Sequence, residues 1–583
     1  MAEPSRLQTR DSALFAAPHF GLDATAVAVG TVLIVIAAIN QPYNQNELQQ
    51  IAPYGSDDLA KIVGATRQPP LDPVLGALLQ HVLGEGQLRQ RLVPVLAGIG
   101  ALIVVACLLR RLRAGAAGTV GLWAMATAPL LVRYSAYARP YALPVFLMLL
   151  FVYAAQSWLD DRKRGWLVVS AVAAVATPLA RVPEPTIFFL VTAATLGVAS
   201  LRGQLTWSQT RPLVAISGAT LVLVCYPLYH LLASQSGGIW DPSPSGVLAR
   251  FGSGVHEVLT GLLPLLGAWL PWWPVTLAIT MLALVVPGSR RRVFHWWFFW
   301  PLLAGPAVFV VAYHFMNPFP FDVRPYRARM AIFFVPVFVL LLVSLTQAAT
   351  EAVASGARSS QRVKVAVNVL VAAALLGQLP ATARVLVDNE APDFGQVAEV
   401  LTQRLPRNAI VLYDTASQAG QWRQPFSARP RYMGYTPYVG QVATMMHYPE
   451  YVPKHGPVYV LLLDSACAVT VVCDEPRAVW SHHLRGWDVA ARFDRFTLFE
   501  PQLELSGRSG VITALEQFGR AMGPDLGYVE TFSAASLLKF QGRPGDGLAL
   551  IQRLYRSADL EAAFRIVLAA ERRALDPFRR GVP

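Results

Sequence analysis

Residues 92–113 read LVPVLAGIGALIVVACLLRRLR, and this stretch decides the fold class. No charged residue interrupts it between Leu92 and Leu109. An α-helix of that length spans about 27 Å, close to the hydrocarbon thickness of a bilayer. The arginines that follow are typical of the cytoplasmic end of a membrane span. The stretch therefore predicts a transmembrane helix that ends on the cytoplasmic side.

Similar apolar runs recur along the chain, and the composition agrees with them. Of the 583 residues, 54% are hydrophobic and 15% are charged, whereas soluble domains carry roughly a quarter charged residues. This excludes an ordinary soluble enzyme, a coiled coil and a disordered chain. We expect a polytopic α-helical membrane protein with about eleven transmembrane helices. They are expected near residues 23–40, 91–109, 118–133, 141–158, 166–181, 186–200, 212–232, 266–287, 293–314, 330–348 and 364–381.

The arginine clusters in the short loops predict the topology. Arg110–Arg113, Arg162–Arg164 and Arg290–Arg292 all fall on one side of the alternating spans, which we assign to the cytoplasm. The first span is expected to be an uncleaved signal anchor with a cytoplasmic N-terminus. The net charge of +13 is then explained by loops and anionic headgroups, and no nucleic-acid partner is expected. The predicted location is the bacterial inner, or plasma, membrane.

The composition changes at the C-terminal side of the last expected span. We expect a membrane domain over residues 1–383 and an extracytoplasmic soluble α/β domain over residues 384–583. Asn408–Asp414 and Gly456–Asp464 have the pattern of buried strands. Cys467 and Cys473 flank a short hairpin-like segment and are candidates for a disulfide on the oxidising side.

Acidic residues mark the first outer loop, residues 41–90, which is long for a connection between neighbouring spans. Glu47 lies a few residues beyond the predicted membrane edge, where a carboxylate can act as a general base on a hydroxyl at the lipid surface. A solvated loop acid is the alternative. Asp57 and Asp58 are the other acids that we consider for the same role.

Two basic and aromatic clusters also lie on the predicted outer face, against the usual bias of arginine towards the cytoplasm. The first is Arg133–Tyr141 (RYSAYARPY), and the second is Phe319–Arg329 (FPFDVRPYRAR). Snorkelling of the arginines to lipid phosphates is one explanation. The other is a clamp for a lipid-linked phosphate, because guanidinium groups bind phosphate in a bidentate manner.

Four motifs in order resemble those of bacterial GT-C glycosyltransferases. They are Glu47, Gln68–Leu71 (QPPL), Leu88–Pro94 (LRQRLVP) and Tyr134–Tyr141 (YSAYARPY). The chain is similar over roughly residues 20–350 to the protein O-mannosyltransferase-like family, which includes the lipid A aminoarabinose transferases. It departs from the family pattern where Asn46-Glu47 replaces Asp-Glu, where Gln68 replaces histidine, and where Ala136-Tyr137 replaces a polar-acidic pair.

The resemblance implies a membrane glycosyltransferase that moves a hexosyl or pentosyl group from a polyprenyl-phosphate donor to an acceptor hydroxyl, with inversion, outside the cytoplasm. The acceptor would be a glycan, lipid or protein. The resemblance implies Glu47 as the base, with Asp57 and Asp58 in reserve. The implied donor-phosphate residues are Arg139, Arg324, Arg327 and Arg329, with Arg67 and Lys61 as weaker candidates, and the implied pocket residues are Tyr43, Asn46, Tyr137 and Tyr141.

No cofactor is required, because arginines can supply the charge. A divalent cation is the alternative, but His, Cys and Asp residues show no ligand spacing that would support it. Two alternatives remain open. One is a transporter or flippase of lipid-linked sugars. The other is an inactive GT-C-like scaffold, which is consistent with Asn46 in place of the family's aspartate. A transporter would place ionisable groups near the bilayer midplane, whereas the unusual polar groups here cluster at one face.

Overall fold

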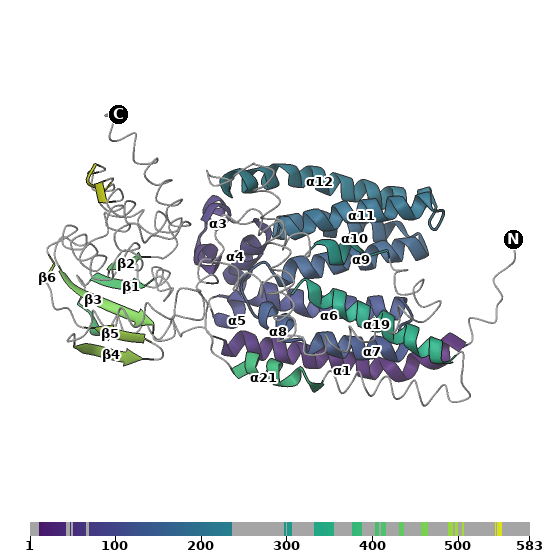
Figure 1. Cartoon of the computed structure of the whole chain (residues 1–583), viewed down its shortest axis with the longest axis horizontal. Coiled ribbons are helices and arrows are strands. Elements are labelled where there is room, and N and C mark those ends of the chain that lie inside the picture. The colour runs from purple at the N-terminus through teal and green to yellow at the C-terminus, as the bar shows by residue number, and fades with distance from the viewer. Residues whose placement is uncertain are drawn as a thin grey trace, which may run out of the picture. The chain divides into compact units, whose positions relative to one another are not determined.

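The fold is described from a computed structural model (Figure 1). It describes residues 11–41, 47, 50–65, 69–84, 86–235, 297–298, 300–305, 332–354, 376–387, 403–406, 410–414, 431–435, 456–463, 488–493, 496–499, 504–505, 543, 545–547 and 549–550. The contacts divide the chain into two compact units. Unit 1 comprises residues 1–41, 50–318 and 325–388, and unit 2 comprises residues 42–49, 319–324 and 389–583.

The described part of unit 1 is helical. Its elements are α1 (Asp11–Asn40), the 3-10 helix η2 (Ala52–Gly55), α3 (Leu59–Ala65), α4 (Leu71–Leu83), α5 (Gln87–Gln90), α6 (Leu92–Arg111), α7 (Gly115–Ala126), α8 (Pro129–Ser135), α9 (Ala142–Asp161), α10 (Arg164–Ala180), α11 (Pro183–Leu201), α12 (Trp207–Gln235), α19 (Phe334–Ala354) and α21 (Leu379–Val387).

Among the described residues, four helices are long and apolar enough to cross a membrane. They are Gly21–Asn40 in α1, Leu92–Arg111, Ala142–Asp161 and Glu184–Leu201. The pair α7 and α8, bent by 51°, makes a fifth if it is one broken span. These helices match the first, second, third, fourth and sixth expected spans. The expected span 266–287 lies outside the described residues, as do most of 293–314 and 364–381, so the count of eleven stays a prediction.

The bend between α7 and α8 follows from Pro129, which cannot donate a backbone hydrogen bond and so interrupts the helix. The break exposes carbonyl groups, and residues around α21 satisfy them. Gln378 Nε2 donates to the carbonyl of Ala124 at 3.0 Å, and Thr382 Oγ1 donates to the carbonyl of Thr127 at 2.6 Å. A broken helix is therefore tolerated because a second helix supplies donors.

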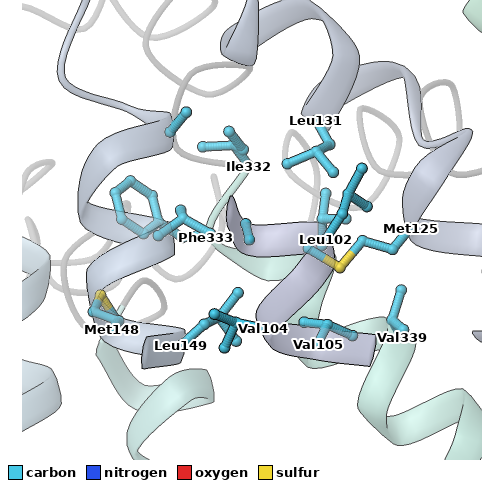
Figure 2. Packing of buried hydrophobic residues seen from close by; sticks show 14 of the residues in the cluster. Leu102, Val104, Val105, Met125, Leu131, Met148, Leu149, Ile332, Phe333 and Val339 are labelled. Carbon is cyan, nitrogen blue, oxygen red and sulfur yellow. The ribbon is translucent and has the colours of Figure 1, made fainter. Parts of the chain in front are cut away.

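The core of unit 1 lies between α6, α7, α8, α9 and α19. Figure 2 shows its packing around Leu102, Val105, Met125, Leu149 and Val339, all of which are buried. The helices approach closely where side chains are small. A Cβ on Gly121 of α7, for example, would meet Val343 of α19 at 2.3 Å.

The bundle of unit 1 has two chemically different ends. Helix α4 lies at the end where α1 finishes and α6, α9 and α11 begin, which we call the α4 end (Figure 1). At the opposite end, Arg111 contacts Asp160 at 3.0 Å and Asp161 at 2.6 Å. The first two predicted arginine clusters therefore share one end of the bundle, and Arg290–Arg292 lies outside the described residues.

Unit 2 contains a β-sheet in its described part. The strands are β1 (Ile410–Asp414), β2 (Arg431–Tyr435), β3 (Gly456–Leu463), β4 (Val489–Phe493), β5 (Phe496–Phe499) and β6 (Glu504–Leu505). Their order is β2-β1-β3-β5-β4, and β6 pairs with β3. β1 is parallel to β2 and β3, whereas the other pairs are antiparallel. The two strands predicted from the sequence are confirmed as β1 and β3, and the α/β domain as a whole stays a prediction.

Candidate functional site

Several buried polar side chains lie at the α4 end of unit 1. Gln50, Asp72, Arg91 and Glu184 have no exposed surface, and Arg139 is 6% exposed. Burying such groups is unfavourable unless each finds a partner. The contacts that hold them therefore define the candidate site.

Asp72 is placed by the start of α4. Pro69 and Pro70 precede the helix, whose first turn contains Asp72. Gln50 Nε2 donates a hydrogen bond of 2.7 Å to Asp72 Oδ2. Burial raises the pKa of the Asp72 carboxyl from 3.8 to about 6, although the Gln50 hydrogen bond and the charge of Arg139 act to lower it. The carboxyl is thus anchored on one oxygen and near Arg139.

Tight packing between η2 and α4 brings Gln50 to Asp72. Tyr54 of η2 is 1% exposed, and its ring lies against Gly76 of α4. A Cβ at Gly76 would lie 2.2 Å from Tyr54 Cζ, so no larger residue fits without a shift. The glycine therefore sets the distance between the segment that carries Gln50 and the helix that carries Asp72.

Arg139 is held in a tight segment between α8 and α9. The amide of Arg139 donates to the carbonyl of Tyr137 at 2.6 Å, and the amide of Tyr141 donates to the carbonyl of Arg139 at 2.7 Å. The ring centroids of Tyr134 and Tyr141 lie 5.4 Å apart, and those of Tyr134 and Tyr137 lie 5.9 Å apart. Edge-to-face rings of this kind fix the backbone that presents Arg139.

A second pair of opposite charges lies where α10 joins α11. Arg181 Nε contacts Glu184 Oε2 at 2.7 Å, and the Glu184 side chain is fully buried. The Arg181 guanidinium carbon lies 5.3 Å from the centroid of the Tyr141 ring and 5.8 Å from that of Phe333. Tyr141 therefore links the segment of Arg139 to Arg181 through a cation–π contact.

Sequence reasoning did not select Asp72, Gln50, Arg181 or Glu184 as site residues. Arg181 and Glu184 carried a signal, because an arginine and a glutamate three residues apart at the start of an apolar helix favour an ion pair. Asp72 gave little signal of a functional role, since an acid in the first turn after two prolines is also typical of an ordinary helix start.

The three predicted acids lie in different environments. Glu47 is fully buried and helical, and it belongs to residues 42–49 of unit 2. Asp57 is exposed, and its Oδ1 lies 2.9 Å from His81 Nε2, a hydrogen bond that raises the pKa of the His81 imidazole. Asp58 is exposed, and its Oδ1 accepts a hydrogen bond of 2.9 Å from the amide of Ala60, as an N-cap of α3 does.

Arg91, in the motif Leu88–Pro94, has a structural role at the α4 end. Arg91 Nη1 donates to the carbonyls of Ala38 at 2.8 Å and Gln41 at 2.6 Å, and Gln87 Nε2 donates to the carbonyl of Ile39 at 3.0 Å and to that of Gln41. The last carbonyls of a helix have no partner within it. Arg91 and Gln87 therefore cap the C-terminus of α1.

Other predicted site residues lie outside the described residues. They are Tyr43, Asn46, Arg67, Arg324, Arg327, Arg329, Cys467 and Cys473. Lys61 lies in α3, but its side chain is among those not described. Within the described residues there is no group of His, Cys, Asp and Glu side chains that would hold a metal ion.

Comparisons with known proteins give a family match over part of the chain and matches to solved structures. Residues 67–230, which contain Asp72, Arg139, Arg181 and Glu184, match a family described as dolichyl-phosphate-mannose-protein mannosyltransferase. The apo structure of ArnT from Cupriavidus metallidurans matches with a TM-score of 0.52 and 14% identity over 82% of this chain and 97% of that chain. The same ArnT bound to undecaprenyl phosphate matches with a TM-score of 0.52 and 15% identity over 82% and 98%. No curated protein sequence matches the chain.

The chain therefore shares its fold with ArnT, and it is a multi-pass membrane protein. The resemblance seen in the sequence, to the mannosyltransferase-like family that includes the aminoarabinose transferases, is confirmed by the family match and the shared fold.

Proposed function

We propose that the chain transfers a hexosyl or pentosyl group from a polyprenyl-phosphate carrier to an acceptor hydroxyl, and that the α4 end carries the reaction. The observation that supports this most is the buried arginine Arg139, whose charge acts on Asp72, within the segment that matches the mannosyltransferase family. One relative of the same fold binds undecaprenyl phosphate. A glycan, lipid or protein is the proposed acceptor.

Arg139 is the proposed contact for the donor phosphate. In the transfer, the bond between the anomeric carbon and the phosphate oxygen breaks, and its electron pair stays on that oxygen. A guanidinium close to this oxygen stabilises the charge that develops there. Arg324, Arg327, Arg329, Arg67 and Lys61 stay proposed as further donor contacts, with Tyr43, Asn46, Tyr137 and Tyr141 as pocket residues.

Glu47 is the proposed base. It would take the proton of the acceptor hydroxyl while the hydroxyl oxygen attacks the anomeric carbon from the face opposite the phosphate, which inverts the configuration. Its burial supports this choice, because a buried carboxylate is shielded from water, whereas Asp57 and Asp58 are exposed. Asp57 and Asp58 therefore rank behind Glu47.

The proposed topology places the α4 end outside the cytoplasm. The ion-paired arginines Arg110 and Arg111 lie at the opposite end, which suits a cytoplasmic surface. With eleven spans, a cytoplasmic N-terminus leaves the domain of residues 384–583 outside, beyond a membrane domain of residues 1–383 in the inner membrane. The disulfide between Cys467 and Cys473 is proposed on the same grounds.

The test is sugar transfer by the purified full chain in detergent, with undecaprenyl phosphates that carry labelled pentoses or hexoses. We expect release of undecaprenyl phosphate with at least one donor, and a loss of at least about a hundredfold in rate for Glu47→Gln. Asp57→Asn is the matched control, an exposed acid of the same loop, and should keep wild-type activity. Full activity of Glu47→Gln would remove Glu47 as the base. Binding of the carrier without any transfer would favour the scaffold instead.

A further inference from the structure

Asp72 and Gln50 form a buried pair in which two acceptor oxygens receive no hydrogen bond from the described residues. Gln50 Nε2 and Asp72 Oδ2 bond to each other at 2.7 Å. The remaining oxygens, Asp72 Oδ1 and Gln50 Oε1, are shielded from solvent and accept no hydrogen bond from the residues that the structure describes. Both side chains are fully buried.

Unsatisfied acceptors are rare in folded proteins because each loses its hydrogen bonds to water on burial. Two of them on adjacent, hydrogen-bonded side chains are best explained by a ligand that brings two donors. The packing of Tyr54 against Gly76 fixes the pair before any ligand arrives.

The charge of the surroundings limits the kind of donor. The positive charge of the Arg139 guanidinium acts on the Asp72 carboxyl, although burial has the larger effect on that group. A second cation, such as an ammonium group, would be repelled by Arg139. Neutral hydroxyl groups are not repelled, and each can donate one hydrogen bond.

We propose that Asp72 and Gln50 bind two hydroxyl groups of the sugar that is transferred, and that this pair selects the donor by its hydroxyl pattern. The proposal rests on the proposed function and names a subsite of the same site. It gives Asp72 a role distinct from that of Glu47, because Asp72 would hold the sugar and Glu47 would take the proton of the acceptor. The sugar is a neutral pentose or hexose with free hydroxyls.

The test is the binding of four kinds of ligand to the purified full chain in lipid nanodiscs, measured as Kd. The ligands are undecaprenyl phosphate alone, the same carrier with a neutral pentose or hexose, the carrier with an amino sugar, and monodeoxy versions of the best-bound neutral donor. The proteins are wild type, Asp72→Leu and Gln50→Leu, with Asp488→Asn, an exposed acid of unit 2, as the control. Leucine is close in shape to aspartate and close in size to glutamine, and it removes the acceptor oxygens.

We expect wild type to bind a neutral sugar donor more tightly than the bare carrier, and to lose about tenfold in affinity when one particular hydroxyl is removed. In Asp72→Leu or Gln50→Leu that loss should shrink to less than about twofold, because the partner of the hydroxyl is gone. Binding of the bare carrier should be unchanged in Gln50→Leu, which leaves every charge of the site in place. Asp488→Asn should behave as wild type with every ligand.

Several results would overturn the proposal. One is that wild type binds every deoxy donor as well as the parent donor, which needs no variant and holds even if Asp72→Leu does not fold. Others are an undiminished deoxy effect in a folded variant, or an affinity preference for the amino sugar that Asp72→Leu abolishes. If wild type binds neither the bare carrier nor any loaded carrier, the proposed function itself fails.

Discussion

Gln50 donates a 2.7 Å hydrogen bond to Asp72 although both side chains are shut away from solvent. The bond joins the segment before η2 to the first turn of α4, and the Arg139 charge acts on the same carboxyl. Residues from three segments of the α4 end therefore act on one acidic group.

The first prediction concerns the pH dependence of stability. The pKa of Asp72 is raised from 3.8 to about 6 in the folded protein, so the folded state holds a proton that the unfolded chain has lost between these values. Its contribution is fully present below pH 3.8 and is lost as the pH rises through about 6. Asp72→Asn stays neutral, so at pH 7.5 its stability should exceed that of wild type by on the order of 3 kcal/mol.

The measurement is the Tm of both proteins in detergent between pH 4 and pH 8. The two curves should meet at the acidic end and separate as the pH rises. Parallel curves over the whole range would show that Asp72 ionises as an ordinary exposed aspartate does. Asp488→Asn, an exposed acid of unit 2, gives the reference for an acid on the surface.

The second prediction concerns the cap of α1. Arg91→Gln removes the Arg91 hydrogen bonds to the carbonyls of Ala38, which is buried, and Gln41, which is partly buried, and should lower stability by about 1–3 kcal/mol. The check is thermal unfolding against Arg89→Gln, an exposed arginine in the same turn, which should change Tm much less. Equal losses in the two variants would contradict the capping role.

The third prediction concerns the packing that sets the Gln50–Asp72 distance. Gly76→Ala adds a methyl group that meets the buried ring of Tyr54, and should lower Tm although alanine favours helices. Gly197→Ala in α11 is the matched control, because nothing lies within 4 Å of the added Cβ. That change should leave Tm equal or higher. A stabilised Gly76→Ala would show that η2 and α4 are packed more loosely.

The sequence predicts the frame of this molecule because its signals are local. An uncharged run such as Leu92–Leu109 suits a membrane span whatever lies around it, and the strands Ile410–Asp414 and Gly456–Leu463 follow from apolar runs bounded by polar residues. The bend at Pro129 also has a local cause, the proline itself. The hydrogen-bond donors that satisfy the carbonyls at the bend belong to Gln378 and Thr382, far along the chain.

The candidate site was less accessible to such reasoning. Arg139 and its tyrosines stand out because a basic and aromatic segment is unusual at the expected outer face. The link between Gln50 and Asp72 depends on long-range packing, and it turns on the close approach of Tyr54 to Gly76. Neither the burial of Asp72 nor its charged neighbour is visible in the order of residues.

The last prediction tests the binding of a lipid phosphate at the α4 end, which is the central claim. Native mass spectrometry of the purified full chain, with added undecaprenyl phosphate or with the lipids that copurify, measures this binding directly. Wild type should retain one polyprenyl phosphate, and Arg139→Gln should weaken its binding about tenfold or more, since a charged hydrogen bond to phosphate is lost.

Arg113→Gln is the control, an exposed arginine at the opposite end of the bundle. The account predicts retention of polyprenyl phosphate by wild type and by Arg113→Gln, with loss in Arg139→Gln. Equal retention by all three proteins, or binding of bulk phospholipids alone, would contradict it.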